Sequence, residues 1–223
     1  MQTISIARFI APANIPPTPL FFIFFNSYLE YSFQLLYICT VNKKEAILKA
    51  ALELLVVKGV HNTPMSEIAK AAGTGMGTIY NYFANKEILI NEIYLGIKKQ
   101  EETLFSRVNT DAPIKTQFED YLTIIIEFFI HQPAYFNFLR QLEASPIITE
   151  ENKVRGRKSV ELMAVLLEQG QQDRIVKNIE MNAILVFIGG AISSYLGQYI
   201  NTANEQQTSL VSHIRMVWDG IKE

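Results

Sequence analysis

The side chains best suited to chemistry lie on one short stretch, residues 76–83, with the sequence MGTIYNYF. Ile79 and Phe83 are four residues apart, so in a helix they would anchor one face against a core. The N-terminal end and the outer face would then present Met76, Gly77, Thr78, Tyr80, Asn81 and Tyr82. Their hydroxyl, amide and apolar groups can contact phosphates and base edges in a DNA groove. The alternative is a small buried helix with its tyrosines half in the core.

Groups for catalysis or metal binding are sparse. The chain has one cysteine, Cys39, and its histidines, His61, His131 and His213, lack the close companions that a metal centre needs. It has no G-x-S-x-G sequence and no Walker loop, and the GTGMG at residues 73–77 does not fit the dinucleotide-binding pattern. We therefore predict no enzyme activity, no metal and no cofactor.

The sequence predicts that residues 76–83 belong to the second helix of a helix-turn-helix. Thr63 is expected to cap a first short helix with Pro64 at its first position, followed by an apolar stripe at Met65, Ile68, Ala69 and Ala72. Gly73 can take the left-handed conformation that ends this helix and reverses the chain. The second helix begins near Gly75 to Gly77 and ends at Ala84. In such a motif the second helix enters the major groove.

The same stretch resembles the DNA-binding domain of the tetracycline-repressor (TetR) family over about residues 43 to 95. The resemblance is carried by Thr63, Ile68, Ala69, Gly73, Gly77, Thr78, Ile79, Tyr80, Tyr82, Phe83 and Lys86. It implies that the residues facing DNA are Thr63, Ser66, Met76, Gly77, Thr78, Tyr80, Asn81, Tyr82 and Lys86. Met76 departs from many relatives, which carry Lys or Gln there, so readout at this position would be apolar.

Charge is distributed unevenly along the chain. The net charge is −2, but eight lysines and five glutamates lie between Lys43 and Gln100. A mildly basic N-terminal module on a more acidic remainder suits a protein that holds phosphates at one end. An even spread of solvated charge could produce the same balance.

Residues 1–42 differ in composition from the rest. We interpret them as a misassigned start, with Val41 as the native initiator, or as a packing arm. A membrane anchor over residues 20–41 is less favoured, because Glu30 would lie inside the span. A secretory signal is a poor fit, because prolines break the apolar core. We thus expect no membrane association.

The chain after residue 42 reads as two all-α domains. Residues 43–90 form the three-helix DNA-binding domain, starting with an amphipathic helix over 43–57 that Gly59 closes. Asn85 is expected to cap a long helix toward Val108, and residues 91–223 form a helical bundle for ligand binding and dimerisation. Within it, residues 149–169 are predicted to form one helix.

Aromatic residues between Phe118 and Phe138 indicate either a core or a pocket. For any one of them a core position is the more common outcome. The family resemblance implies a pocket for a small apolar effector, and its predicted lining is Phe118, Tyr121, Leu122, Ile125, Phe129, Phe136 and Met163.

The last two helices are predicted to form a homodimer interface. Small residues recur every four positions over residues 182–202, a pattern that lets helices approach closely. The expected interface residues are Gly189, Gly190, Ser193, Gly197, Ile214 and Trp218. The alternatives are burial within the monomer and a membrane span, although the apolar run is short and ends in polar residues.

These features predict a cytoplasmic, homodimeric transcriptional regulator that binds a double-stranded DNA operator. A small apolar ligand would release it by favouring a spacing of the paired recognition helices that differs from the groove repeat of about 34 Å. The alternatives are an activator, a TetR-fold DNA binder without an inducer, and an enzyme or carrier that uses the apolar pocket.

Overall fold

The computed structural model describes residues 43–143, 145–201 and 209–223. Residues Ile47–Glu223 form one compact unit. Of the residues before it, only 43–46 are described, and they form the first turn of a helix over residues 43–58. The predictions for residues 1–42 lie outside the described part. The predicted domain boundary after residue 90 falls inside a helix and stays a prediction.

The regular elements of the described residues are all helices, and the predicted all-α fold is confirmed. After the helix over 43–58 come α3 (Met65–Ala71), α4 (Met76–Tyr82), α5 (Lys86–Phe105), α6 (Ile114–His131), α7 (Pro133–Leu142), α8 (Glu150–Arg155), α9 (Lys158–Gln172), α10 (Met181–Asn201) and α11 (Leu210–Ile221). These residues contain no β-strand, only an isolated bridge between Val176 and Lys222.

The short N-terminal helices end where the sequence predicts. Gly59 and Gly73 adopt positive φ values of 83° and 62°, which a residue with a Cβ rarely takes. Asn85 caps α5, because its side chain accepts a hydrogen bond of 2.8 Å from the backbone N–H of Ile88. Thr63 is not the predicted cap of α3. Pro64 is the N-cap rather than the predicted first helical residue, and its side chain has no atom that can form a cap hydrogen bond. The Thr63 hydroxyl instead donates back to the Gly59 carbonyl at 2.9 Å.

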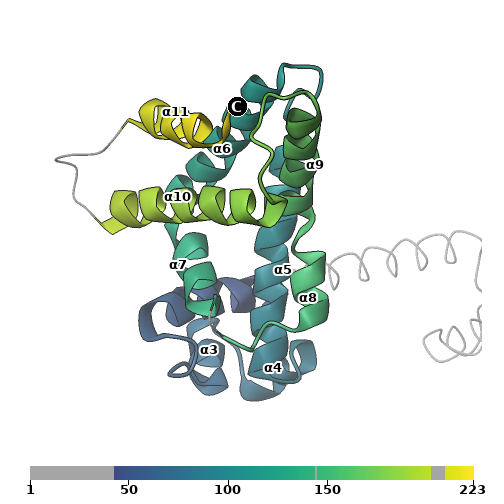
Figure 1. The fold of residues 1–223 in the computed structure, drawn as a ribbon. Helices are drawn as coiled ribbons and strands as arrows, with labels where there is room; N and C mark the ends of the chain where they lie inside the picture. Colours follow the sequence, from purple (N-terminus) through teal and green to yellow (C-terminus); the bar gives the residue numbers. More distant parts are fainter. Residues whose placement is uncertain (1–42, 144, 202–208) are drawn as a thin grey trace, which may run out of the picture. The chain divides into compact units, whose positions relative to one another are not determined.

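The helix α5 runs from the helix-turn-helix into the remaining bundle (Figure 1). Its first turns lie beside α4, and further along it packs against α6, α8 and α9. The helix α10 crosses the bundle and packs against α6, α9 and α11. Phe118 of α6 and Trp218 of α11 meet in the core, with ring centroids 5.2 Å apart.

Residues 149–169 form two helices rather than the predicted one. The helix α8 ends at Arg155, and α9 begins at Lys158. Gly156 lies between them, and a Cβ there would come within 2.5 Å of the Tyr94 hydroxyl. The tyrosine ring of α5 thus packs directly against this backbone, which only a glycine permits.

One described helix is long and apolar enough to cross a membrane by length and composition, Met181–Ile200 of α10. Its inner face, with Ile184, Ile188 and Leu196, is buried in the core. The buried core helices of globular proteins are often long and apolar enough as well.

Candidate DNA-binding surface and effector cavities

The helix α4 presents the predicted side chains outward because two apolar residues hold its other face. Ile79 is fully buried and Phe83 nearly so. Met76 and Tyr80 are 40% and 48% exposed. Gly77, Asn81 and Ser66 of α3 are also exposed, while Thr78 and Tyr82 are half-buried.

The turn between α3 and α4 is fixed by backbone hydrogen bonds. The Thr74 N–H donates to the Ala69 carbonyl at 2.9 Å, and the Gly73 N–H donates to the Lys70 carbonyl at 3.1 Å. With Gly73 in the left-handed region, this is the bonding pattern of a Schellman cap. It sets the angle at which α4 leaves α3.

Thr63 and Lys86 do not lie as the DNA-contact prediction requires. Thr63 is fully buried, so its side chain cannot reach a groove. Lys86 Nζ lies 2.9, 3.5 and 3.3 Å from the carbonyl oxygens of Val60, His61 and Thr63. An ammonium group has three donors, and all three are directed at this loop. We therefore remove both residues from the DNA-contact set.

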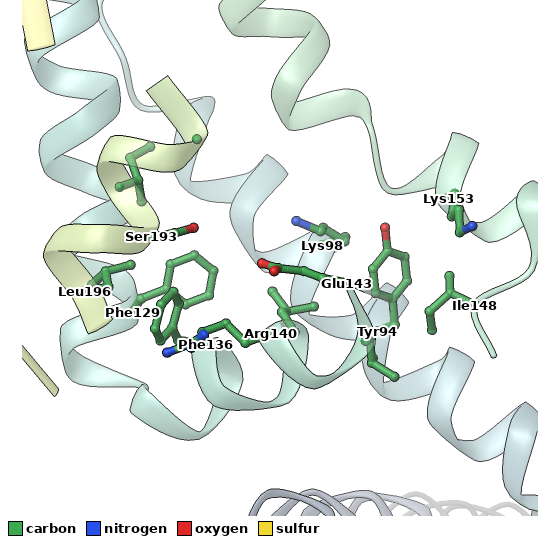
Figure 2. Close-up of a pocket in the computed structure, with 14 residues that line it drawn as sticks. Tyr94, Lys98, Phe129, Phe136, Arg140, Glu143, Ile148, Lys153, Ser193 and Leu196 are labelled. Carbon is green, nitrogen blue, oxygen red and sulfur yellow. The ribbon is translucent and has the colours of Figure 1, made fainter. Parts of the chain in front are cut away.

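Two adjacent cavities lie in the bundle. The outer cavity, about 370 Å³, is lined by Tyr94, Lys98, Phe129, Phe136, Leu139, Arg140, Leu142, Glu143, Ile148, Lys153, Gly189, Ile192, Ser193 and Leu196. Figure 2 shows side chains from α5, α7 and α10 around this space. The inner cavity, about 180 Å³, shares Lys98, Phe129, Gly189 and Ile192 with it.

Most of the predicted pocket residues line one of these cavities. Phe129 and Phe136 line the outer one, and Tyr121, Leu122, Ile125, Phe129 and Met163 line the inner one. Phe118 lines neither, because its ring is fully buried against Trp218. The structure places it in the core, which was the alternative interpretation.

The polar residues that line the cavities were not predicted from the sequence. Lys98 Nζ lies 3.0 Å from each carboxylate oxygen of Glu101, and the Ser159 hydroxyl donates to the same carboxylate at 3.1 Å. Glu101 is 3% exposed and lines the inner cavity, while Lys98 is half-buried and lines both cavities. Burial raises the pKa of Tyr94, and the Glu101 carboxylate raises it further. Burial also raises the pKa of Tyr121.

Arg140 and Glu143 of α7 also line the outer cavity and were not predicted from the sequence. The Arg140 guanidinium lies 5.6 Å from the ring centroid of Phe136, and within the described ranges no carboxylate forms an ion pair with it. Lys153 is paired with Glu150 at 2.7 Å. Within the same ranges, no three His, Cys, Asp or Glu side chains group together as a metal site.

The small-residue stripe of α10 mainly faces the cavities. Gly189 and Ser193 line the outer cavity, and a Cβ on Gly197 would lie 3.6 Å from the Arg140 guanidinium. Ile214 and Trp218 are each 4% exposed and lie in the core. Ile214 and Trp218 therefore do not form a free surface for a second subunit, as the dimer prediction required. Gly189 and Gly190 are exposed and Ser193 and Gly197 are half-buried, so their place in an interface stays a prediction.

The DNA-binding helices are connected directly to the wall of the outer cavity. Gln141 of α7 donates from Nε2 to the Val56 carbonyl, near the end of the helix over 43–58, at 3.1 Å. Its neighbours Arg140 and Leu142 line the cavity. This hydrogen bond joins the α7 wall of the outer cavity to the helix over 43–58.

Comparisons with known proteins agree with this geometry. Residues 47–93 match the family of bacterial regulatory proteins called the tetR family. The chain is 25% identical over 179 residues to the fatty acid metabolism regulator protein of Bacillus subtilis (strain 168), covering 74% of this chain and 87% of the relative.

Solved structures show the same fold over most of both chains. A TetR family transcription regulator from Marinobacter aquaeolei VT8 superposes with a TM-score of 0.72 at 20% identity, covering 82% of this chain and 96% of the other. The regulator FadR from Bacillus subtilis, solved in complex with stearoyl-CoA, has a TM-score of 0.63 at 22% identity, covering 78% and 95%. The helix-turn-helix of residues 47–93 thus belongs to the tetR family of regulatory proteins, and the chain as a whole has the fold of solved TetR family regulators.

Proposed function

We propose that the protein is a repressor whose affinity for its DNA operator falls when an effector occupies the two cavities. The observation that carries this proposal is the position of the outer cavity. Its α7 wall is hydrogen-bonded to the first DNA-binding helix through Gln141 and Val56. An occupant that moves α7 therefore changes the placement of the DNA-binding helices.

The proposed DNA contacts come from α3 and α4. They are Ser66, Met76, Gly77, Thr78, Tyr80, Asn81 and Tyr82, which are exposed or half-exposed on one side of the helix-turn-helix. Thr78 and Asn81 can hydrogen-bond to phosphates or base edges, and the Met76 side chain suits a thymine methyl group.

We propose that a homodimer forms through the outward face of α10 and the neighbouring part of α11. Val186 and Phe187 are 66% and 48% exposed, and Met216 of α11 is 59% exposed. The Phe187 ring reaches α11, since a Cβ on Gly220 would lie 3.0 Å from it. A two-fold pair would present two copies of α4 to successive major grooves, about 34 Å apart. A protein that binds chromosomal DNA is expected in the cytoplasm.

The proposed effector carries a long apolar chain and a polar or anionic head, with an acyl thioester as the first candidate. The inner cavity offers mostly aliphatic and aromatic side chains, while Lys98, Arg140 and Lys153 line the outer one. Similarity to a fatty acid metabolism regulator and to a structure solved with stearoyl-CoA supports this class.

The test begins with DNA fragments selected by the purified protein from a random library. Binding of a selected fragment is then measured by fluorescence anisotropy with and without stearoyl-CoA. We expect stearoyl-CoA to weaken binding by about 5- to 150-fold, the usual range of allosteric coupling. Unchanged affinity with stearoyl-CoA, and with a panel of acyl chains, would favour a DNA binder without an inducer.

A matched pair of glycine substitutions locates the effector. Gly189 lines both cavities, and a Cβ there meets nothing within 4 Å, so Gly189→Leu fills the space without a backbone clash. Gly96 of α5 is exposed, lies in neither cavity and is equally open. We expect Gly189→Leu to abolish the stearoyl-CoA response and Gly96→Leu to retain it. Equal responses in both variants would place the effector elsewhere.

A further inference from the structure

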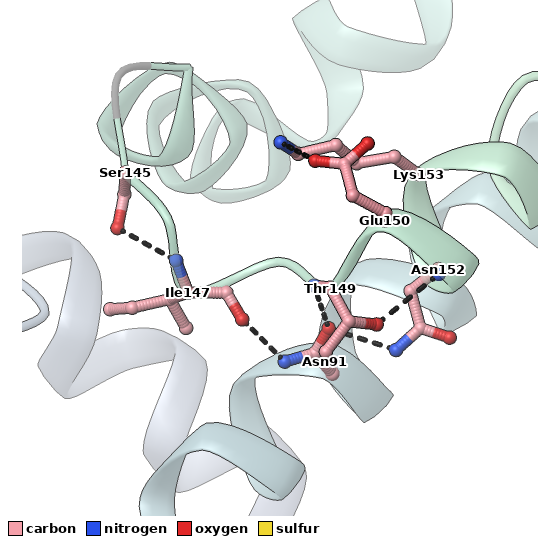
Figure 3. A network of polar contacts seen from close by, with 7 residues as sticks. All are labelled: Asn91, Ser145, Ile147, Thr149, Glu150, Asn152 and Lys153. Atoms are coloured by element: carbon pink, nitrogen blue, oxygen red, sulfur yellow. Dashed lines mark hydrogen bonds and ion pairs between the residues drawn. The ribbon is translucent and has the colours of Figure 1, made fainter.

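Asn91 uses every hydrogen-bonding position of its side chain. It is 7% exposed in the second turn of α5. Its Nδ2 donates to the Glu87 carbonyl at 2.8 Å. Nδ2 also donates to the Ile147 carbonyl at 2.9 Å, and Oδ1 accepts from the Thr149 N–H at 3.2 Å and from Asn152 Nδ2 at 2.8 Å (Figure 3). An asparagine amide has two donor hydrogens and two acceptor lone pairs. A flipped amide would set its oxygen against two carbonyls, so this orientation is the only one that satisfies all four partners.

One side of this network belongs to the DNA-binding helices. Asn91 lies on the α5 segment that begins directly after the recognition helix. In the first turn, Lys86 is hydrogen-bonded to the loop before α3. In the next, Leu89 and Ile90 are fully buried in the core. The start of α5 thus moves together with α3 and α4.

The other side belongs to the wall of the outer cavity. Ile147 and Thr149 lie in the segment that links α7 to α8, and Asn152 lies in the first turn of α8. Ile148 lies between two residues that Asn91 holds, is 4% exposed and lines the outer cavity together with Lys153. An occupant that displaces Ile148 must therefore displace the two peptide groups bonded to Asn91.

We propose that Asn91 is the positioning residue that couples the outer cavity to the DNA-binding helices. This inference rests on the proposed function, in which occupancy of the cavity changes DNA affinity. A buried polar network is satisfied in one arrangement and is costly to leave half-satisfied. Movement of residues 145–149 therefore carries the start of α5 with it. Coupling free energies are reciprocal, so DNA bound at α4 also alters the 145–153 segment.

Amide hydrogen exchange of the full chain tests this coupling without an effector. In the wild type, a selected DNA fragment should change the exchange rate of residues 145–153 by about fivefold or more. In Asn91→Leu, which cannot form the four bonds, this change should disappear while the fragment still binds. Asn152→Ala removes one bond only and should reduce the change.

Gln117→Leu is the matched control. Gln117 is also a buried amide, 9% exposed, whose Nε2 donates to the carbonyls of Thr110 at 3.0 Å and Ala112 at 2.6 Å. It lines neither cavity, so Gln117→Leu should keep the DNA-induced change even though it removes the same kind of bonds.

Two results would overturn the inference. One is a wild-type segment that does not respond to DNA, and the other is an equal response in Asn91→Leu. If Asn91→Leu does not fold, an undiminished response in Asn152→Ala overturns it. Failure of the proposed function has a different signature. In that case no acyl compound changes DNA affinity, whereas the exchange experiment still decides whether Asn91 couples the two regions.

Discussion

Replacing Lys86 with methionine separates a structural role from a DNA-binding role. The wild-type ammonium donates to three carbonyls of the loop before α3, and only the bond to Val60, at 2.9 Å, is short. Hydrogen bonds to charged groups contribute about 1.5–3 kcal/mol each when well formed. The site is half-buried, and water can replace the two longer bonds. We therefore expect Lys86→Met to lower the free energy of unfolding by about 2 kcal/mol.

Two assays on the same preparation check this expectation. Thermal unfolding should show the loss of stability as a melting temperature lower by about 4–8 °C for a chain of this size. Titration of a selected DNA fragment at several salt concentrations should show an unchanged slope of log affinity against log salt. Loss of one phosphate contact would reduce that slope by about 0.9. A reduced slope with an unchanged melting temperature would refute the structural role and restore Lys86 as a phosphate contact.

Three further outcomes follow from the site. Tyr80→Ala should weaken operator binding by about 1–3 kcal/mol in a mobility-shift titration at fixed salt, without changing the oligomeric state. Lys98→Met leaves the Glu101 carboxylate buried without its cation, so the free energy of unfolding measured with urea should fall by about 3 kcal/mol. The double variant Lys98→Met with Glu101→Leu removes the buried charge as well and should recover most of this loss. Because burial and then Glu101 raise the pKa of Tyr94 above 10.0, folding favours the protonated phenol. Its contribution is complete below pH 10 and is lost as the pH rises through the folded-state pKa, so Tyr94→Phe should flatten the fall in stability measured by urea unfolding on the alkaline side.

The features that could be predicted from the sequence are those that depend on neighbouring residues. Gly73 marks a left-handed turn because no other residue takes that conformation at so little cost. Asn85 marks a helix start because a short polar side chain can reach the backbone three residues on. The spacing of Ile79 and Phe83 decides which face of α4 is buried. For this reason the exposed side of the recognition helix was predictable before its surroundings were known.

The features that could not be predicted depend on segments far apart in the chain. Thr63 is a local exception, because it has the residue type of a helix cap but its hydroxyl donates to the Gly59 carbonyl, four residues earlier. The spacing of Trp218 predicts an interface residue, but in the structure its ring packs against Phe118 in the core. Lys98 and Glu101 lie on α5, whose apolar residues show little helical periodicity, so the sequence does not indicate which face is buried. The packing of α9 against α5 is what buries the Glu101 carboxylate.

The small residues of α10 were predicted to form one dimer interface, but in the structure they do not all have the same surroundings. Small residues on a helix permit close approach, but they do not say what approaches. Here Gly189 and Ser193 leave room for the outer cavity, whereas Gly190 lies outward beside the exposed Val186 and Phe187. The helix that walls the cavity therefore also carries the proposed dimer face. A ligand that shifts α10 would alter both the cavity and the distance between two recognition helices, so a single rigid helix suffices to link effector binding to operator spacing.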